Sequence, residues 1–295
     1  MNGPQVSLLA DGRRLHLNHG PIDLIVEAFG EAAEIGAAYR QARRRFETIL
    51  TELVEELPNL RRPAQSEPRV FRHPTAPRRM ETAASLFAGE TFVTPMAAVA
   101  GSVADEMLAA MISGRRLERA YVNNGGDIAL HLAPGASLKA AIAGTGKGFA
   151  DGLEITFRDV ARGIATSGRH GRSHSLGIAD AVTVLARCAA EADVAATLIA
   201  NAVDLPDHPA IHRSPANALS PDSDLGDRPV TVGLDPLTPQ EIDAALQAGV
   251  SVAQDFVEAG LIEAAILYLG GSERVCRRVL SAPHQKHLQE ELAHA

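Results

Sequence analysis

A carboxylate and a hydroxyl lie four residues apart, at Asp193 and Thr197, in an alanine-rich segment whose pattern predicts a helix. Side chains at positions i and i+4 project from the same helix face, so these two oxygen donors point the same way. Such ligands suit Mg²⁺, which keeps some of its waters and takes the rest of its shell from one or two carboxylates and a substrate phosphate. Two ordinary roles compete with this interpretation. A helical Thr often bonds the carbonyl four residues earlier, and an Asp in a first turn often stabilises the helix N-terminus.

A polar turn precedes this helix, between two apolar segments that are predicted to be strands. It carries hydroxyl and cationic donors around a glycine, in the order Thr166, Ser167, Gly168, Arg169, His170, Arg172 and His174. These donors and the neighbouring backbone N–H groups suit a phosphate or a carboxylate. The alternative is an exposed polar loop without a ligand. Asp180, at the start of the following strand, is an acid that could pair with one of the arginines.

A second turn is predicted at Asn123, Asn124, Gly125 and Gly126, directly before Asp127. Asn and Gly accept a positive φ, which makes this run typical of a tight hairpin. On its own the pattern predicts only a turn, with or without a ligand.

The composition narrows the classes of function. The 295 residues include 28 basic and 36 acidic ones, for a net charge of −8, and 46% are hydrophobic. Neither a polybasic block nor an aromatic stacking platform is present, so we expect no nucleic-acid partner. The longest apolar region, residues 92–112, contains Asp105 and Glu106, which argues against a membrane span. The N-terminus lacks the apolar core of a secretory signal, so we expect a cytoplasmic protein.

Helical patterns are predicted in several parts of the chain. A long helix opens at Pro21 and Asp23 and is stopped by Pro58. A second helix begins after Thr94 and Pro95 and runs to Ile112. Residues 238–241 have the spacing of a capping box that begins a further helix.

Short alternating runs predict strands at residues 119–123, 127–132, 138–143, 153–157, 181–186 and 230–234, with a last strand at 264–269. Residues 60–79 and the long segment 204–229 are predicted to be loops without secondary structure of their own. The order of these elements favours an α+β fold in which an antiparallel sheet is covered by helices.

Four segments, in this order, resemble the ApbE flavin transferases, and especially their uncharacterised cytoplasmic relatives. They are TPMAAVAG at 94–101, NNGGDI at 123–128, GIATSG at 163–168 and ADVAAT at 192–197. The resemblance implies a single ApbE-like, T-fold-like domain over residues 1–295, with a long loop at 204–229. Together the four segments bracket about a third of the chain.

The resemblance also implies a chemistry. In the family, FAD is cleaved at its pyrophosphate, and the FMN half is transferred to a Thr or Ser hydroxyl of a flavoprotein, with Mg²⁺ holding the phosphates. Asp193 and Thr197 match the metal-binding Asp and Thr, and Ala97 matches a third ligand position to which it can offer only its carbonyl. The implied cofactor contacts are Thr94, Asn124, Gly125, Gly126, Asp127, Thr166, Ser167, Gly168, Arg169, Arg172 and His174.

The chain also departs from the family pattern. Thr94 replaces an Asp that contacts the nucleotide, and Ala100 replaces a Lys or Glu. A His followed by Asp-Pro-x-Thr-Gly is reduced here to the turn around His170 and His174. Two alternatives to an FMN transferase therefore stay open: a non-catalytic flavin- or nucleotide-binding module, and an enzyme acting on another phosphorylated or acidic metabolite. No catalytic residue is assigned from the sequence.

Overall fold

A nine-stranded antiparallel sheet forms the centre of the computed structural model, which describes residues 3–89, 91–141, 152–171 and 173–278. The strands follow one another across the sheet in chain order. They are β1 (Gln5–Leu8), β2 (Leu15–His19), β3 (Ile22–Gly30), β4 (Leu117–Asn124), β5 (Asp127–Leu132), β8 (Gly163–Ser167), β9 (Ala181–Ala186), β12 (Ala264–Leu269) and β13 (Ser272–Arg277). Two hairpins stand apart from it: β6 (Ser137–Ala141) with β7 (Gly152–Thr156), and β10 (Ile211–Pro215) with β11 (Pro229–Leu234).

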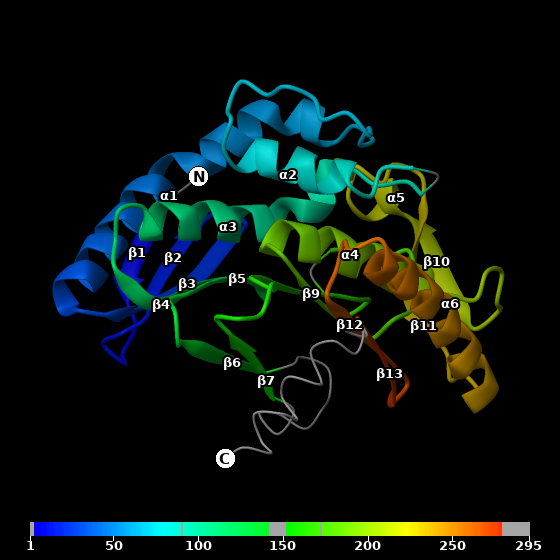
Figure 1. Cartoon of the computed structure of the whole chain (residues 1–295). Coiled ribbons are helices and arrows are strands. Elements are labelled where there is room, and N and C mark those ends of the chain that lie inside the picture. Colours follow the sequence, from blue (N-terminus) through cyan, green and yellow to red (C-terminus); the bar gives the residue numbers. More distant parts are fainter. Residues whose placement is uncertain (1–2, 90, 142–151, 172, 279–295) are drawn as a thin grey trace, which may run out of the picture.

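Helices cover one face of the sheet, and the β6–β7 hairpin lies on the other side (Figure 1). The layer against the sheet contains α1 (Ala32–Leu60), α3 (Val99–Ile112), α4 (Ala189–Ala202) and α6 (Pro239–Glu258). The helix α2 (Ala76–Ser85) packs on α1, α3 and the 3-10 turn η1 (Pro95–Ala98), and α5 (Ala216–Leu219) follows β10. The α+β architecture expected from the sequence is therefore confirmed.

The central helix α3 is apolar on nearly every side because it packs against the sheet, α1, α2 and α4. Together with η1, it is the one helix of the described residues that is long and apolar enough to cross a membrane, and half of that window is buried in the fold. Its two acids have partners inside the protein. Asp105 accepts the N–H groups of Ala189 and Ala190, and Glu106 pairs with Arg45 and Arg79.

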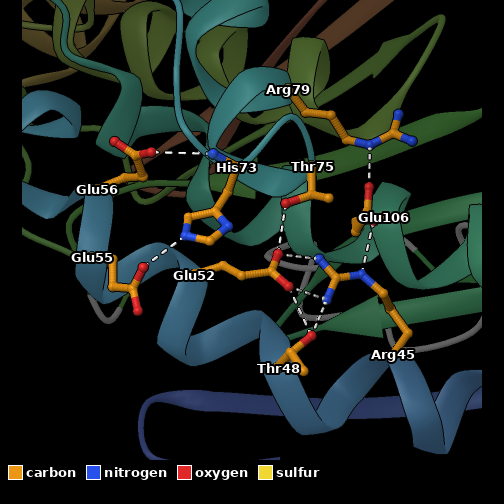
Figure 2. A network of polar contacts seen from close by, with 9 residues as sticks. All are labelled: Arg45, Thr48, Glu52, Glu55, Glu56, His73, Thr75, Arg79 and Glu106. Carbon is orange, nitrogen blue, oxygen red and sulfur yellow. Dashed lines mark hydrogen bonds and ion pairs between the residues drawn. The ribbon is translucent and has the colours of Figure 1, made fainter.

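A largely buried network of charges fastens α2 to α1 and α3 (Figure 2). Arg45 of α1 binds Glu52 at 2.6 Å and Glu106 of α3 at 2.8 Å, and all three side chains are at most 16% exposed. Arg79 of α2 donates to the other oxygen of Glu106 at 2.9 Å. Buried ion pairs of this kind often add little net stability, yet breaking one leaves an uncompensated charge. The network therefore fixes where α2 lies.

The two halves of the sheet meet at β5 and β8 through two residue pairs, Ile128 with Ile164 and Ala129 with Gly163. The helices α3 and α4 pack above this seam, against β5 and against β8 respectively. A Cβ on Gly163 would lie 2.1 Å from the backbone of Cys188, and one on Gly101 would lie 2.3 Å from the carbonyl oxygen of Ala189. Only glycine permits these close approaches between the sheet, α3 and the first turn of α4.

Most of the predicted elements are present. The strands at 127–132, 181–186 and 264–269 have the observed bounds, and the η1–α3 segment and α6 begin at the predicted Thr caps. The predicted strand 138–143 corresponds to β6, with its last two positions outside the described residues.

Several expectations were wrong. Residues 22–30 form β3, because Ile22, Leu24, Val26 and Ala28 alternate toward the helices with period two. The helix that follows begins at Ala32 and continues past Pro58 to Leu60. The end of the predicted loop 60–79 belongs to α2, which extends to Ser85, and β12 is followed by the edge strand β13.

The segment 204–229 also differs from the loop that was predicted. It contains β10 and α5, and β10 pairs with β11 from Ile211 opposite Leu234 to Pro215 opposite Pro229. Its many Pro and Asp residues concealed this order, because the pairing partner lies beyond the segment and the alternation within β10 is short.

The close approach at Gly163 gives a first prediction. We expect Gly163→Ala to lower the free energy of unfolding by about 2 kcal/mol or more, because the new Cβ meets backbone that cannot move aside without shifting α4. Gly89→Ala, where an added Cβ meets nothing within 4 Å, is the matched control. Denaturant unfolding measures both, and equal midpoints would contradict the proposed tight contact.

Candidate functional site

The first turns of α3 and α4 satisfy each other's backbone. Neither N-cap residue, Ala98 or Cys188, provides a side-chain cap. Instead Asp105 of α3 accepts the N–H groups of Ala189 and Ala190 at 3.1 and 2.9 Å. Asp193 of α4 accepts the N–H of Gly101 at 2.9 Å. The N–H groups of a first helical turn have no partner within the helix. Each acid therefore accepts N–H groups that the other helix leaves unpaired.

Asp193 therefore serves a helix N-terminus, although not that of its own helix. Burial raises the pKa of Asp193 well above its usual range, and the charge of Asp127 raises it further. The N–H groups of Gly101 and Ala100 act in the opposite direction. The negative charge of Asp127 thus acts on Asp193, which bonds the first turn of α3.

The β4–β5 turn brings Asp127 to this place. Gly125 and Gly126 have φ values of 67° and 117°, which favour glycine, and the N–H of Gly126 bonds the side chain of Asn123 at 2.9 Å. The buried Asn124 donates its amide to the carbonyl of Ala100 at 3.1 Å. The turn is consequently fastened to the start of α3.

Across the seam, Asp127 accepts the N–H of Thr166 in β8 at 3.2 Å. The Thr166 hydroxyl lies 2.9 Å from that of Thr183 in β9, and Ser167 follows as the last residue of β8. Side chains therefore continue the link between the two halves of the sheet beyond the short β5–β8 ladder.

At η1, the nearly buried Thr94 accepts the N–H of Met96 at 3.2 Å and donates its hydroxyl to Asp224. Ala97 lies within η1, and its N–H bonds the carbonyl of Thr94 at 3.1 Å. Because η1 packs against α4, the backbone of Ala97 lies on the same side of the fold as Asp193 and Thr197.

The polar turn after β8 is held by Asp180. Arg169 pairs with this carboxylate at 2.7 Å, His170 lies 3.3 Å from it, and its second oxygen accepts the N–H of Gly270 at 2.7 Å. A Cβ on Gly168 would lie 2.5 Å from the carbonyl oxygen of Asp180. The pairing of an arginine with Asp180 that the sequence suggested is present, and it neutralises Arg169.

Two of the predicted contacts, His174 and Arg172, remain to be placed. His174 bonds the hydroxyl of Ser220 at 3.2 Å. Arg172 lies outside the described residues. Among the residues that the structure does describe, no group of three or more His, Cys, Asp and Glu side chains could hold a metal ion. Any cation here would depend on one carboxylate of α4 with hydroxyl, carbonyl and water ligands.

Three residues that build this region, two acids and one glycine, were not identified as site residues from the sequence. Asp105 and Gly101 lie in an apolar helical pattern that indicated only a buried helix, and Asp224 lies in a segment predicted to be a loop. A glycine and an acid on one face of an otherwise apolar helix were the available signal, since both residue types are unfavourable there without a partner.

A cavity of about 360 Å³ lies between α2 and the first turn of α4, and includes Arg78, Arg79, Asp105 and Cys188. None of the predicted ligand contacts lines it. Burial raises the pKa of the Cys188 thiol to about 12, so the thiol stays protonated near neutral pH and is a poor nucleophile.

Comparisons with known proteins agree on one group of relatives. The model of the family described as AbpE bacteria matches residues 6–275. A UPF0280 protein of Methanobrevibacter smithii is 40% identical over 130 residues, which are 42% of this chain and 50% of that protein. UPF0280 protein MK0206 of Methanopyrus kandleri is 34% identical over 195 residues, 62% of this chain and 59% of that protein. The chain thus spans about half the length of the first of these relatives.

Among solved structures, a mutant of the flavin transferase ApbE from Vibrio cholerae has a TM-score of 0.50 at 14% identity. The match covers 92% of this chain and 99% of that one. At this identity the similarity establishes a shared fold and does not by itself establish a shared activity.

The capping by Asp105 gives a second prediction. We expect Asp105→Ala to lower the free energy of unfolding by about 2 kcal/mol, because the two N–H groups of α4 lose their acceptor. Asp105→Asn keeps one acceptor and is expected to lose less. Asp255→Ala, at an exposed position of α6, is the control. Unfolding in urea measures the free energy of unfolding of the three variants. An Asp105→Ala protein as stable as wild type would show that the cap is dispensable.

Proposed function

Because the chain belongs to the AbpE bacteria family, we propose that it binds a flavin nucleotide, FAD or FMN, together with Mg²⁺. The site we propose lies where η1, the β4–β5 turn, the end of β8 and α4 meet. The observation that carries the proposal is that Asp193 of α4 and Asn124 of the β4–β5 turn both bond the first turn of α3, at the seam of a fold shared with a flavin transferase. Two neighbouring carboxylates repel one another, and a divalent cation between or beside them relieves this repulsion.

The donors available fit Mg²⁺. Asp193 and Thr197 would hold the ion with the backbone carbonyl of Ala97, and Asp127 lies near enough to add negative charge. All are hard oxygen ligands, and they are few, as Mg²⁺ prefers when it keeps several waters and binds a phosphate. When bound, the ion would neutralise charge on the phosphate oxygens of the nucleotide.

The chain's own groups have distinct roles in this proposal. The N–H of Gly101 holds the carboxylate of Asp193 at the first turn of α3, on the side of the fold where η1 lies. The glycines of the β4–β5 turn allow a ligand to approach the backbone closely, because no Cβ intervenes. Thr166, Ser167 and Gly168 lead into the turn where Arg169 supplies a guanidinium for an anionic group.

Transfer of FMN to a flavoprotein acceptor is the activity that the resemblance to the ApbE flavin transferases implies, and a binding module without transfer is the second candidate. Thr94 favours the second, because its hydroxyl is already bound to Asp224 rather than free for a nucleotide. Incubation with FAD, Mg²⁺ and an acceptor flavoprotein distinguishes them. Flavin fluorescence that survives denaturing electrophoresis indicates transfer, and binding without such a band indicates the module.

Asp193 should control the binding of the cation. We expect FAD and FMN to bind more tightly with Mg²⁺ than without it, and Asp193→Asn to abolish most of this difference. The change removes the anionic ligand but keeps an acceptor for the N–H of Gly101. Titration calorimetry with FAD, FMN and ADP, with and without Mg²⁺, measures the effect. Glu191→Gln, on the same helix but paired with Arg187, is the matched control.

If Mg²⁺ raises the nucleotide affinity of the Asp193→Asn protein as much as that of wild type, Asp193 does not belong to the cation site and serves only as a helix cap. A wild type that binds none of the three nucleotides would contradict the proposed function. That result would favour an enzyme acting on another phosphorylated or acidic metabolite.

Asp180 should limit the effect of Arg169 on an anionic ligand. We expect Asp180→Asn to tighten nucleotide binding up to about fivefold at low salt, because it releases a guanidinium charge, and Arg169→Ala to weaken it. Asp243→Asn, which breaks the exposed pair with Arg274, is the control. If added salt changes all of these affinities equally, Arg169 does not contact the ligand.

A further inference from the structure

A loop built on β10 and β11 reaches the predicted ligand contacts. The loop, residues 216–228, is closed on itself by hydrogen bonds from the N–H of Asn217 to the carbonyl of Gly226 and from the N–H of Ala216 to the carbonyl of Arg228, at 2.8 and 3.0 Å. Because both of its ends belong to a paired hairpin, the fold itself determines where the residues of the loop lie.

Three side chains of this loop contact the segments that carry predicted ligand contacts. Ser220 bonds His174 at 3.2 Å, and Asp224 accepts the hydroxyl of Thr94. The guanidinium of Arg228 lies 3.3 Å from the ring centroid of Phe92, two residues before Thr94. In the described part of the chain, no basic side chain forms an ion pair with Asp224, so the Thr94 hydroxyl is the partner that fixes its place.

The bond to Asp224 determines how Thr94 acts as a cap. A hydroxyl has one proton and can rotate to give it to any nearby acceptor. When the proton goes to Asp224, a lone pair of the Thr94 oxygen faces the N–H of Met96, the bond observed at 3.2 Å. The carbonyl of Thr94 meanwhile accepts the N–H of Ala97 at 3.1 Å. Thr94 thus holds the first turn of η1 from its side chain and its backbone.

We propose that Asp224 is a positioning residue for the cation site, acting through Thr94. It holds the Thr94 hydroxyl in its capping orientation, and the capped η1 presents the carbonyl of Ala97 to the cation. The inference rests on the proposed function. A carboxylate suits this task because its hydrogen bond from a hydroxyl is stronger than that of a neutral acceptor.

The test measures the affinity of the full chain for Mn²⁺, detected by electron paramagnetic resonance. The unfolding midpoint is measured on the same samples. We expect Asp224→Ala to weaken Mn²⁺ binding about fivefold, the loss typical of a removed cap. Asp224→Asn keeps an oxygen that accepts the Thr94 hydroxyl and should stay within about twofold of wild type. Asp222→Ala, exposed and two residues earlier, should bind as wild type does.

A double-mutant cycle tests whether Asp224 acts through Thr94. Thr94→Val should weaken Mn²⁺ binding as Asp224→Ala does, and the double variant should be no weaker than either single one. Losses that multiply would overturn the proposal, as would an Asp224→Ala protein with a lowered unfolding midpoint and wild-type affinity. If wild type itself binds no Mn²⁺, the metal part of the proposed function fails with it, whereas an unaffected Asp224→Ala overturns the positioning alone.

Discussion

Two helix N-termini lie side by side in the centre of this fold, and the carboxylates that satisfy them fix the arrangement around them. A buried N–H group without a partner is costly, and the first turns of α3 and α4 have no caps of their own. Asp105 and Asp193 each supply the acceptor that the other helix lacks. Neither helix can shift without exposing the other's unpaired groups, and Gly101 removes the side chain that would keep them apart.

The same constraint explains why the candidate site lies at the join between the two halves of the sheet. The β5–β8 ladder is short there, so side chains take over the linking: Asp127 bonds Thr166, and Asn124 bonds Ala100. Polar groups that would be unfavourable in a continuous core are thus collected in one place. The cost of this arrangement is visible in the raised pKa of Asp193, to which burial and Asp127 both contribute.

The elements outside this centre differ in what they add. The network of Arg45, Glu52, Glu106 and Arg79 holds α2 over the helical layer, but none of the predicted ligand contacts belongs to it. The loop 216–228 is different, because it bonds both Thr94 and His174. A segment rich in Pro and Asp therefore contacts two of the predicted ligand residues, even though its composition is that of a loop.

Several features were determined by the sequence alone. The family resemblance, the α+β class and the strands at 127–132, 181–186 and 264–269 depend on local alternation, turn residues and motif order, which are present in consecutive residues. Where the helical and strand periods of apolar residues overlap, the sequence alone does not separate them, as at β3, whose short apolar alternation directly precedes α1. The partners of the acids, by contrast, depend on how distant segments pack together. Asp193 lies beside Gly101, Asp224 beside Thr94 and Asp180 beside Arg169 because helices and hairpins distant in sequence pack together. An aspartate is the same residue in the sequence whether it caps a helix, neutralises an arginine or faces a ligand. Its role is set by the donors that the fold places within hydrogen-bonding distance.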